Sequence, residues 1–330
     1  MPIIVPEDHP LLPKLGSPEA IGLQRALHQG WRPINILIFN MMADKEATER
    51  QLAECIGRTP LQVHLTFATT DSYVTKVANG YESENTPSDY IRKFYAPFSA
   101  IRCQKFDGLI VTGVNAKHPC VTLEEFYPEI VQLLQWSETN VFSSLFLCWG
   151  AMAALKHFHK IDSTPGETKL HGLFEHSITS DKTRLISEWS DVASLPLSRW
   201  KRPDLSAIQK CAALEIVALS KEAGANIIVE AAPYDEGLYY PKRVYVNGHP
   251  EYPTDELAKE WRRDQDRKPT VIVPLPQNYF TKDNPELPII NRWRKTGDLY
   301  KDWVEKVYQA TPWRIEDVPQ PFSSKSLEYG

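Results

Sequence analysis

Short apolar runs alternate with amphipathic segments along the first half of the chain. An apolar run of about four to eight residues bounded by polar turns is typical of a buried strand, whereas apolar positions three or four residues apart are typical of a helix. The pattern predicts strands at residues 34–39, 61–67, 108–112 and 141–147. It predicts helices at residues 45–56, 88–94 and 123–137, and a polar loop at 69–87. This alternation indicates an α/β fold with a doubly wound, mostly parallel sheet.

The second half of the chain has shorter apolar runs, and its tail is rich in proline and aromatic residues. It predicts strands that complete the sheet and add an antiparallel edge, at residues 184–186, 214–219, 225–229 and 243–246. A helix is predicted at 300–308. The N-terminal segment contains several prolines and one amphipathic stretch at 20–28. We therefore expect an N-terminal arm (1–33), a core domain (34–263) and a C-terminal extension packed on the core (264–330).

Composition and charge exclude several classes of partner. The 330 residues carry a net charge of −5, with 42% hydrophobic and 24% charged residues, as in ordinary globular proteins. No cluster of lysine and arginine marks a surface for nucleic acid or anionic membrane, and no apolar run reaches the roughly 18 residues of a membrane span. The N-terminus has no signal-peptide pattern, and the five cysteines are scattered. We therefore expect a cytoplasmic protein without a disulfide framework or structural zinc.

One cysteine lies where a predicted strand changes abruptly into a predicted helix. The apolar run 141–147 leads into Cys148, and Trp-Gly-Ala-Met-Ala-Ala-Leu after it is typical of the first turns of a tightly packed helix. The positive end of a helix stabilises a thiolate, and a turn of this kind exposes the sulfur at the edge of the sheet, as in the nucleophile elbow of serine hydrolases. A lone cysteine after a strand is more often a small buried hydrophobe. Cys148 alone therefore does not indicate catalysis, and a second catalytic residue is required.

That second group follows the last predicted strand. Residues 243–246 lead into Asn-Gly-His-Pro-Glu-Tyr at 247–252. His249 is a base suited to activating a thiol, and Glu251 is placed to hold the imidazole in one tautomer. Cys148 and His249 each follow a predicted parallel strand, and open α/β sheets place their sites at this edge. The three residues together predict a catalytic triad.

Ordered blocks run through nearly the whole chain. They are Ile-Leu-Ile-Phe-Asn-Met-Met (36–42) with Lys45 and Thr48-Glu49, Pro-Leu-Gln-Val (60–63), Asn-Thr-Pro (85–87), Phe-Asp-Gly-Leu-Ile-Val-Thr-Gly (106–113), Leu-Cys-Trp (147–149), Asn-Gly-His-Pro-Glu-Tyr (247–252) and Asn-Tyr-Phe (278–280). These blocks resemble those of the homoserine O-acyltransferases in the glutamine-amidotransferase-like superfamily. The resemblance implies a class I glutamine-amidotransferase-like (flavodoxin-like) fold, with residues 34–263 as the catalytic domain.

The resemblance also implies a ping-pong acyl transfer. The Cys148 thiolate attacks the thioester of an acyl-CoA, and His249, oriented by Glu251, then activates the hydroxyl of L-homoserine. The backbone N–H of Trp149 is implied as an oxyanion donor, and Lys45 matches an active-site lysine of the family. Succinyl-CoA or acetyl-CoA is then a co-substrate, no cofactor is bound, and the product feeds methionine or related sulfur amino acid synthesis.

Three further residues match substrate-binding positions of the family. They are Lys169 in Glu-Thr-Lys-Leu, Ser198 in Leu-Ser-Arg and Arg263 in Trp-Arg-Arg-Asp. Arg263 matches the arginine that grips the carboxylate of the amino acid, for which a bidentate guanidinium–carboxylate pair is the expected chemistry. Leu197 stands where the family has histidine, so the chain departs from the pattern beside Ser198.

A second departure follows Thr112-Gly113. Val-Asn-Ala-Lys-His-Pro-Cys (114–120) replaces the family's Ala-Pro continuation, and an ungapped alignment places Lys117 where the family has glutamate for acetyl or glycine for succinyl. A lysine facing the acyl pocket would pair with a succinyl carboxylate, so we expect succinyl to be favoured narrowly over acetyl. His118 and Cys120 lack a third ligand at a suitable spacing, so we expect no metal site.

Other functions stay open on the sequence. The acceptor is homoserine, or alternatively serine or another hydroxy amino acid. A glutamine amidohydrolase shares the fold and the Cys-His-Glu set, and a non-catalytic binding relative would keep the fold alone. Rates with both acyl donors, and release of glutamate from glutamine, would separate these functions. We expect small-molecule substrates, no nucleic-acid or membrane partner, and a homodimer.

Overall fold

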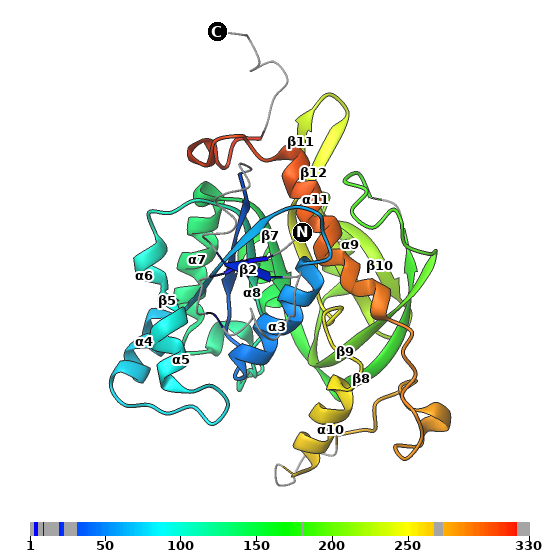
Figure 1. Cartoon of the computed structure of the whole chain (residues 1–330). Coiled ribbons are helices and arrows are strands. Elements are labelled where there is room, and N and C mark those ends of the chain that lie inside the picture. Colours follow the sequence, from blue (N-terminus) through cyan, green and yellow to red (C-terminus); the bar gives the residue numbers. More distant parts are fainter. Residues whose placement is uncertain are drawn as a thin grey trace.

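The computed structural model describes residues 3–5, 9, 20–22, 32–179, 181–266 and 273–321. Its centre is one 12-stranded sheet in the order β2-β1-β4-β3-β6-β7-β12-β11-β10-β8-β9, with β5 beside β4 (Figure 1). Every pair from β2 to β12 is parallel. These strands, with β5, are β2 (Ala20–Gly22), β1 (Ile3–Val5), β4 (Val63–Thr69), β3 (Ile34–Phe39), β6 (Phe106–Val111), β7 (Val141–Leu147), β12 (Leu238–Val246) and β5 (Ala96–Pro97).

The other part of the sheet is antiparallel. Here β12 pairs with β11 (Gly224–Asp235), β11 with β10 (Glu215–Ser220), β10 with β8 (Ser163–Ile178) and β8 with β9 (Val192–Pro203). The carboxyl ends of β7 and β12 therefore lie where the parallel and antiparallel parts meet. A mostly parallel α/β sheet was predicted, and the structure confirms it.

Helices cover both faces of the parallel part. In β3, Ile36 and Ile38 join one buried cluster, whereas Leu37 and Phe39 join another. Successive residues of a strand point to opposite faces, so a continuous apolar run marks a strand buried on both sides. The first cluster includes α3 (Lys45–Ile56) and α11 (Asp298–Ala310), and the second includes α6 (Phe98–Ile101), α7 (Tyr127–Asn140) and α8 (Trp149–His159).

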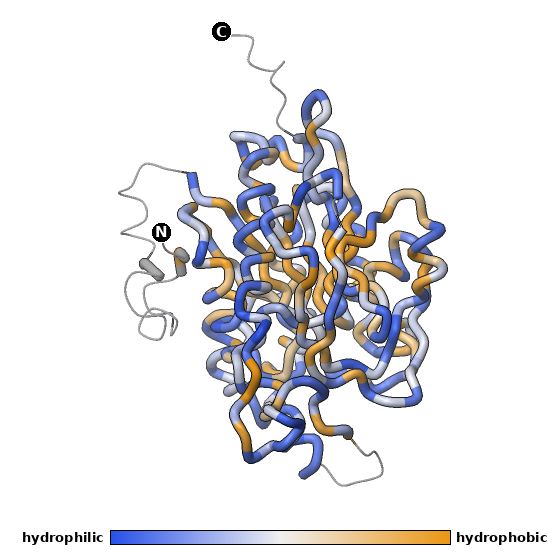
Figure 2. Tube along the Cα trace, turned by 90° about the vertical axis from the view of Figure 1, so that its right-hand side faces the viewer, coloured by the Kyte–Doolittle hydropathy of each residue, from blue (hydrophilic) through white to orange (hydrophobic). Residues whose placement is uncertain are grey.

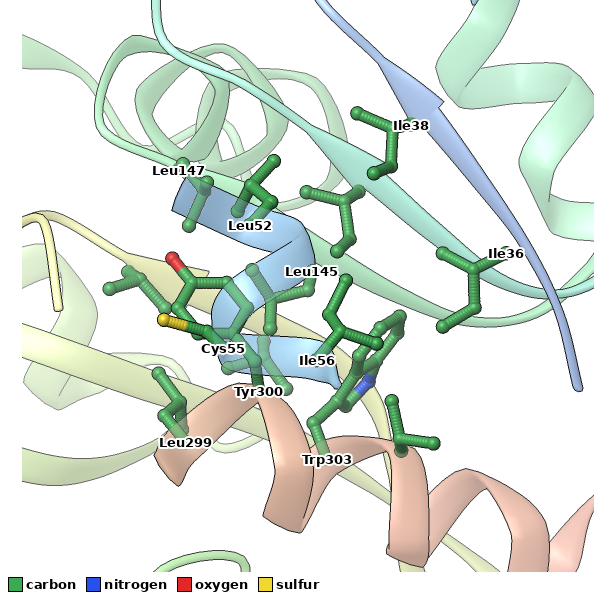
Figure 3. Close-up of a cluster of buried hydrophobic side chains, with 14 of the residues drawn as sticks. Ile36, Ile38, Leu52, Cys55, Ile56, Leu145, Leu147, Leu299, Tyr300 and Trp303 are labelled. Carbon is green, nitrogen blue, oxygen red and sulfur yellow. The ribbon is translucent and has the colours of Figure 1, made fainter. Parts of the chain in front are cut away.

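The late helix α11 packs as part of the main core. Figure 3 shows Tyr300 and Trp303 of α11 pointing toward Leu145 of the sheet and Ile56 of α3. At Gly108 in β6, an added Cβ would lie 2.6 Å from the Trp303 ring, so only glycine allows this close approach. The Trp303 indole N–H donates to Ser143 Oγ at 2.8 Å. Contacts far apart in the sequence thus hold α11 against the sheet.

The remaining elements surround this core. They are the helices α4 (Asp71–Ala78), α5 (Ser88–Phe94), α9 (Leu205–Lys210) and α10 (Glu256–Asp266), and the 3₁₀ turns η1 (Val121–Leu123), η2 (Thr281–Asp283), η3 (Arg294–Gly297) and η4 (Ile315–Asp317). Figure 2 shows hydrophobic residues gathered along the central strands and hydrophilic residues toward the periphery. Within the ranges described, no helix is both long and apolar enough to cross a membrane.

Most predicted elements of the parallel part coincide with observed ones. The predicted strands 34–39 and 141–147 and the predicted helices 45–56 and 88–94 match β3, β7, α3 and α5 at both ends. The predicted loop 69–87 is wrong in part, because it contains α4. Thr70 caps this helix by accepting a hydrogen bond from the Tyr73 N–H at 3.3 Å. Val77 is the one fully buried residue of this short helix, so α4 lacks the repeated buried apolar positions that reveal a helix in a sequence.

The antiparallel part departs most from the sequence-based picture. The predicted strand 184–186 is wrong, because Arg184 has φ +53° and its N–H closes a turn onto Asp181 O at 3.1 Å. Leu185 and Ile186 are buried by tertiary packing instead. The long strands β8 and β9 were not predicted.

The three-part division of the chain stays a prediction. In the described part of the predicted arm, β1 and β2 pair at the edge of the sheet. Of the amphipathic stretch 20–28, residues 20–22 form β2 and residues 23–28 lie outside the described ranges. Helix α10 runs across the predicted boundary at 263.

Candidate active site

Cys148 sits in a strained turn between β7 and α8. Its backbone has φ +48° and ψ −110°, a conformation that non-glycine residues rarely adopt and that clusters at functional sites. Its N–H donates to Val246 O at 2.7 Å, and its carbonyl accepts from the Met152 N–H at 3.2 Å, which starts α8. An added Cβ at Gly150 would lie 2.8 Å from Val111 O, so glycine lets α8 begin against β6. The predicted strand-to-helix turn is confirmed.

His249 and Glu251 follow the neighbouring strand. Val246 of β12 pairs with Leu147 of β7, so the two chains emerge from the sheet side by side. The His249 Nδ1 lies 2.8 Å from Glu251 Oε1, and the imidazole lies near enough to Cys148 for the sulfur to act on its charge. Its ring stacks on Tyr252 with centroids 4.3 Å apart. The structure therefore brings the three predicted triad residues together in the line Cys148–His249–Glu251.

The charges around His249 favour its protonated form. Burial opposes a charge on the imidazole, but Glu251, a Cys148 thiolate and the hydrogen bonds to both outweigh burial and hold the pKa of His249 well above 6.5. The imidazole hydrogen-bonded to the Glu251 carboxylate therefore tends to keep its proton at neutral pH. A thiolate–imidazolium pair is the reactive form of a cysteine nucleophile.

A tyrosine that the sequence did not single out completes this line. Tyr300 of α11 donates its hydroxyl to Glu251 Oε2 at 2.6 Å, and both side chains are buried. Glu251 therefore has one oxygen on His249 and the other on Tyr300. Figure 3 shows Tyr300 in the cluster between α11 and α3. The helix 300–308 was predicted, but a contact across 49 residues leaves no local sequence signal.

A cavity of about 260 Å³ opens above Cys148. The sequence-predicted site residues on its wall are Cys148, Trp149, Lys169, Ser198 and Arg263. Its other lining residues are Val114, Asn115, Ala116, Met152, Arg199, Trp200, Lys201, Glu260 and Asp264. A bulge in β8, between the pairs Pro165–Lys201 and Leu170–Arg199, carries Lys169 to this wall. The structure therefore brings the predicted substrate-binding residues to the nucleophile.

Part of the cavity wall carries paired opposite charges. Lys169 Nζ lies 2.8 Å from Asp264 Oδ2, and Arg263 lies 3.0 Å from Asp264 Oδ1 and 4.0 Å from Glu260. One Glu260 oxygen accepts from the Tyr252 hydroxyl at 2.9 Å, while the buried Oε2 has no hydrogen-bond partner within the described chain. A guanidinium beside an unsatisfied carboxylate suits a zwitterion. Glu260 was not singled out in the sequence.

Ser198 is held by a neutral histidine. Its hydroxyl lies 3.2 Å from His171 Nδ1. Burial, and secondarily the charge of Lys169, lowers the pKa of His171 to about 4. His171 is thus neutral at physiological pH and orients Ser198 without adding charge to the cavity.

Lys45 lies behind the site and is not part of the cavity wall. Its ammonium is buried and donates to Asn40 O at 2.7 Å and Met42 O at 3.2 Å, which closes the turn after β3. Burial lowers the pKa of Lys45 to about 7, although Glu49 opposes this shift. These contacts give Lys45 a place in shaping the turn, and its role in the reaction stays a prediction.

Lys117 is exposed and does not line the cavity. Its N–H and that of His118 each donate to Glu124 Oε1 at 2.8 Å, which fixes the loop. Val114, Asn115 and Ala116 line the cavity instead. The structure does not support the expectation that Lys117 faces the acyl pocket. Of this loop, residues just before Lys117 reach the cavity, and a role of the loop in acyl selectivity stays a prediction.

Comparison with known proteins identifies the family of this chain. A family model described as homoserine O-succinyltransferase matches residues 2–313. A homoserine O-acetyltransferase of Thermotoga petrophila is 36% identical over 323 residues, covering 96% of this chain and all of that protein. One of Bacillus subtilis is 35% identical over 317 residues, covering 95% and 99%. Among solved structures, a glutamine amidotransferase from Thermotoga maritima superimposes with a TM-score of 0.48 at 14% identity, covering 84% of this chain and 99% of that chain. The chain therefore belongs to the homoserine O-succinyltransferase family and is an acyltransferase.

Proposed function

We propose that this enzyme moves an acyl group from coenzyme A to the side-chain hydroxyl of L-homoserine through an acyl thioester on Cys148. The observation that carries the proposal is Cys148 beside the hydrogen-bonded pair His249–Glu251, at a cavity that Cys148 lines together with Arg263 and Glu260. A nucleophile with its base, next to an amino-acid site, suits two substrates that react in turn. A product that feeds sulfur amino acid synthesis in the cytoplasm follows from the same proposal.

In the first half-reaction the Cys148 thiolate attacks the carbonyl carbon of the acyl-CoA thioester. Within the described chain no side chain caps the start of α8, so the N–H of Trp149 is a donor for the oxyanion. The bond from the carbonyl carbon to the sulfur of coenzyme A breaks, and the imidazolium of His249 gives its proton to the leaving thiolate. One thioester replaces another, so the step is nearly neutral in energy.

In the second half-reaction the neutral imidazole of His249 takes the proton of the homoserine hydroxyl. The oxygen attacks the acyl thioester, the bond to Cys148 breaks, and the thiolate–imidazolium pair is restored. Arg263 and Glu260 carry the charges complementary to the carboxylate and ammonium of the acceptor. Glu251 orients the ring in both half-reactions.

Mass spectrometry of the intact protein tests this function directly. Incubation with acetyl-CoA or succinyl-CoA is expected to add one acyl group at Cys148, and L-homoserine is expected to remove it as the O-acyl ester. Serine and glutamine serve as competing tests. Removal of the acyl group by serine but not by homoserine would show that serine is the acceptor. Release of glutamate from glutamine would indicate an amidohydrolase. The absence of an adduct with either donor would overturn the proposal.

Replacement of Arg263 by alanine is expected to impair only the second half-reaction. The acceptor carboxylate loses a charge-assisted hydrogen bond, which corresponds to about a 10- to 100-fold loss in kcat/KM for homoserine. Formation of the acyl-enzyme should stay nearly unchanged in a stopped-flow measurement. Arg262→Ala, an exposed neighbour on α10 outside the cavity, is the matched control. Equal loss in both half-reactions would indicate a structural role for Arg263.

Replacement of Tyr300 by phenylalanine is expected to slow both half-reactions about 10-fold. The change keeps the packed ring but removes a hydrogen bond to the charged Glu251, and His249 acts in both steps. Tyr308→Phe on the same helix, with Tyr308 49% exposed, is the control. Single-turnover rates and far-UV circular dichroism provide the measurement. Wild-type rates in Tyr300→Phe would show that the Tyr300 hydroxyl does not contribute to catalysis.

A further inference from the structure

A buried lysine on β9 reaches the cavity without a partner. Lys201 is 8% exposed, it lines the cavity with Cys148, and its ammonium Nζ makes no hydrogen bond within the described chain. The acidic or thiol groups near enough to act on its charge are Glu124, Cys120 and Cys148. Glu124 already accepts hydrogen bonds from the Lys117 and His118 N–H groups through Oε1. A buried ammonium in this state is costly unless a ligand supplies an anion.

The side chains of the cavity wall as a whole also carry more positive than negative charges. Four basic residues (Lys169, Arg199, Lys201 and Arg263) face two acidic ones (Glu260 and Asp264). Lys169 and Arg263 both pair with Asp264. Arg199 instead donates to the backbone carbonyls of Lys201 (3.1 Å) and Ala223 (2.6 Å), and among the described residues neither Arg199 nor Lys201 forms an ion pair. The side chains that line the cavity therefore include two more basic than acidic residues.

The two substrates differ in which of them can supply the missing anion. Homoserine is a zwitterion, and Arg263 with Glu260 already matches both of its charges. The phosphates of coenzyme A are separated from the thioester by the whole pantetheine arm, whereas Lys201 is buried and lines the same cavity as Cys148. The remaining part is the acyl group, whose far end must lie within the cavity when its carbonyl carbon is on Cys148.

We propose that Lys201 binds the terminal carboxylate of a dicarboxylic acyl group of succinyl type and thereby selects the acyl donor. The proposal rests on the acyl-transfer function above and adds a subsite to it. The pairing with a succinyl carboxylate that we expected of Lys117 from the sequence is thus assigned to Lys201, which lies on β9. The carboxylate forms an ion pair with the ammonium in a site shielded from water, where such a pair discriminates strongly against an uncharged acyl chain.

Replacement of Lys201 by methionine tests this subsite, because methionine keeps most of the length and removes the charge. We expect the wild-type enzyme to prefer succinyl-CoA. In Lys201→Met, kcat/KM for succinyl-CoA should fall by about 30-fold or more, while that for acetyl-CoA is unchanged or higher. Lys201→Arg should retain most of the succinyl preference. Lys117→Met, exposed and outside the cavity, is the matched control and should change neither rate.

Donors built on dephospho-coenzyme A separate the two possible sources of the anion. If Lys201 binds the acyl carboxylate, the loss in Lys201→Met is the same with and without the 3′-phosphate. An equal loss for acetyl and succinyl donors that disappears with dephospho-coenzyme A would assign Lys201 to the 3′-phosphate of coenzyme A and overturn the proposal. A wild-type preference for acetyl-CoA would also overturn it, but leave acyl transfer intact. Absence of any acyl-enzyme would instead contradict the proposed function itself.

Discussion

Cys148→Ala is expected to abolish acyl transfer while leaving the fold unchanged. Without the sulfur no acyl thioester forms, and loss of a nucleophile in a catalytic triad lowers kcat by about 10⁴-fold or more. The strained backbone at φ +48° stays in place, because alanine keeps the Cβ. Intact-protein mass after incubation with each acyl-CoA, together with the rate of O-acylhomoserine formation, measures the effect.

The other cysteines provide the control for this experiment. Cys103 is exposed and does not line the cavity, so Cys103→Ala should accumulate the acyl adduct as the wild type does. All five cysteines are free, so each is in principle a site for nonspecific acylation. An adduct of unchanged stoichiometry in Cys148→Ala that homoserine still discharges would show that another residue is the nucleophile.

Local sequence signals sufficed where neighbouring residues build the site. The run into Cys148 and the His-Pro-Glu segment after β12 are each continuous in sequence, and parallel strands bring their carboxyl ends to one edge. The strand pairing then places His249 beside Cys148 without further information. For this reason the parallel core and the line of three side chains were predictable.

Residues that reach the site across the fold were not predictable in this way. Tyr300 lies on a helix whose apolar face indicates only that it packs somewhere, and Lys201 lies on β9, a strand that contains Pro196 and ends at Pro203. Proline is depleted in strands because it cannot donate to the ladder. The bulge in β8 breaks the period of two that marks a strand. Polar residues of the cavity wall therefore lie on elements whose sequence pattern is weakest.

His249→Ala is expected to lower the rate of both half-reactions about 10³-fold. The base that activates the thiol and later the hydroxyl is lost, and general acid–base catalysis contributes about 10² to 10⁴. The residual rate should rise with pH as hydroxide replaces the missing base, whereas the wild-type rate should be flat around neutrality. His159→Ala, on α8 and outside the cavity, is a control for loss of a partly buried histidine.

Glu251→Gln then tests why the imidazole keeps its proton. Burial alone would lower the pKa of His249, and Glu251 and Cys148 raise it well above 6.5. Removing the carboxylate charge should therefore lower this pKa, which a nitrogen-15 NMR titration of the ring records. The raised pKa also stabilises the folded state: this contribution is fully present below about pH 6.5, the unfolded value, and is lost as pH rises through the folded pKa. The urea midpoint of the wild type should accordingly fall more between pH 6.5 and alkaline pH than that of Glu251→Gln. The same His249 pKa in both proteins would mean that Glu251 orients the ring without setting its charge.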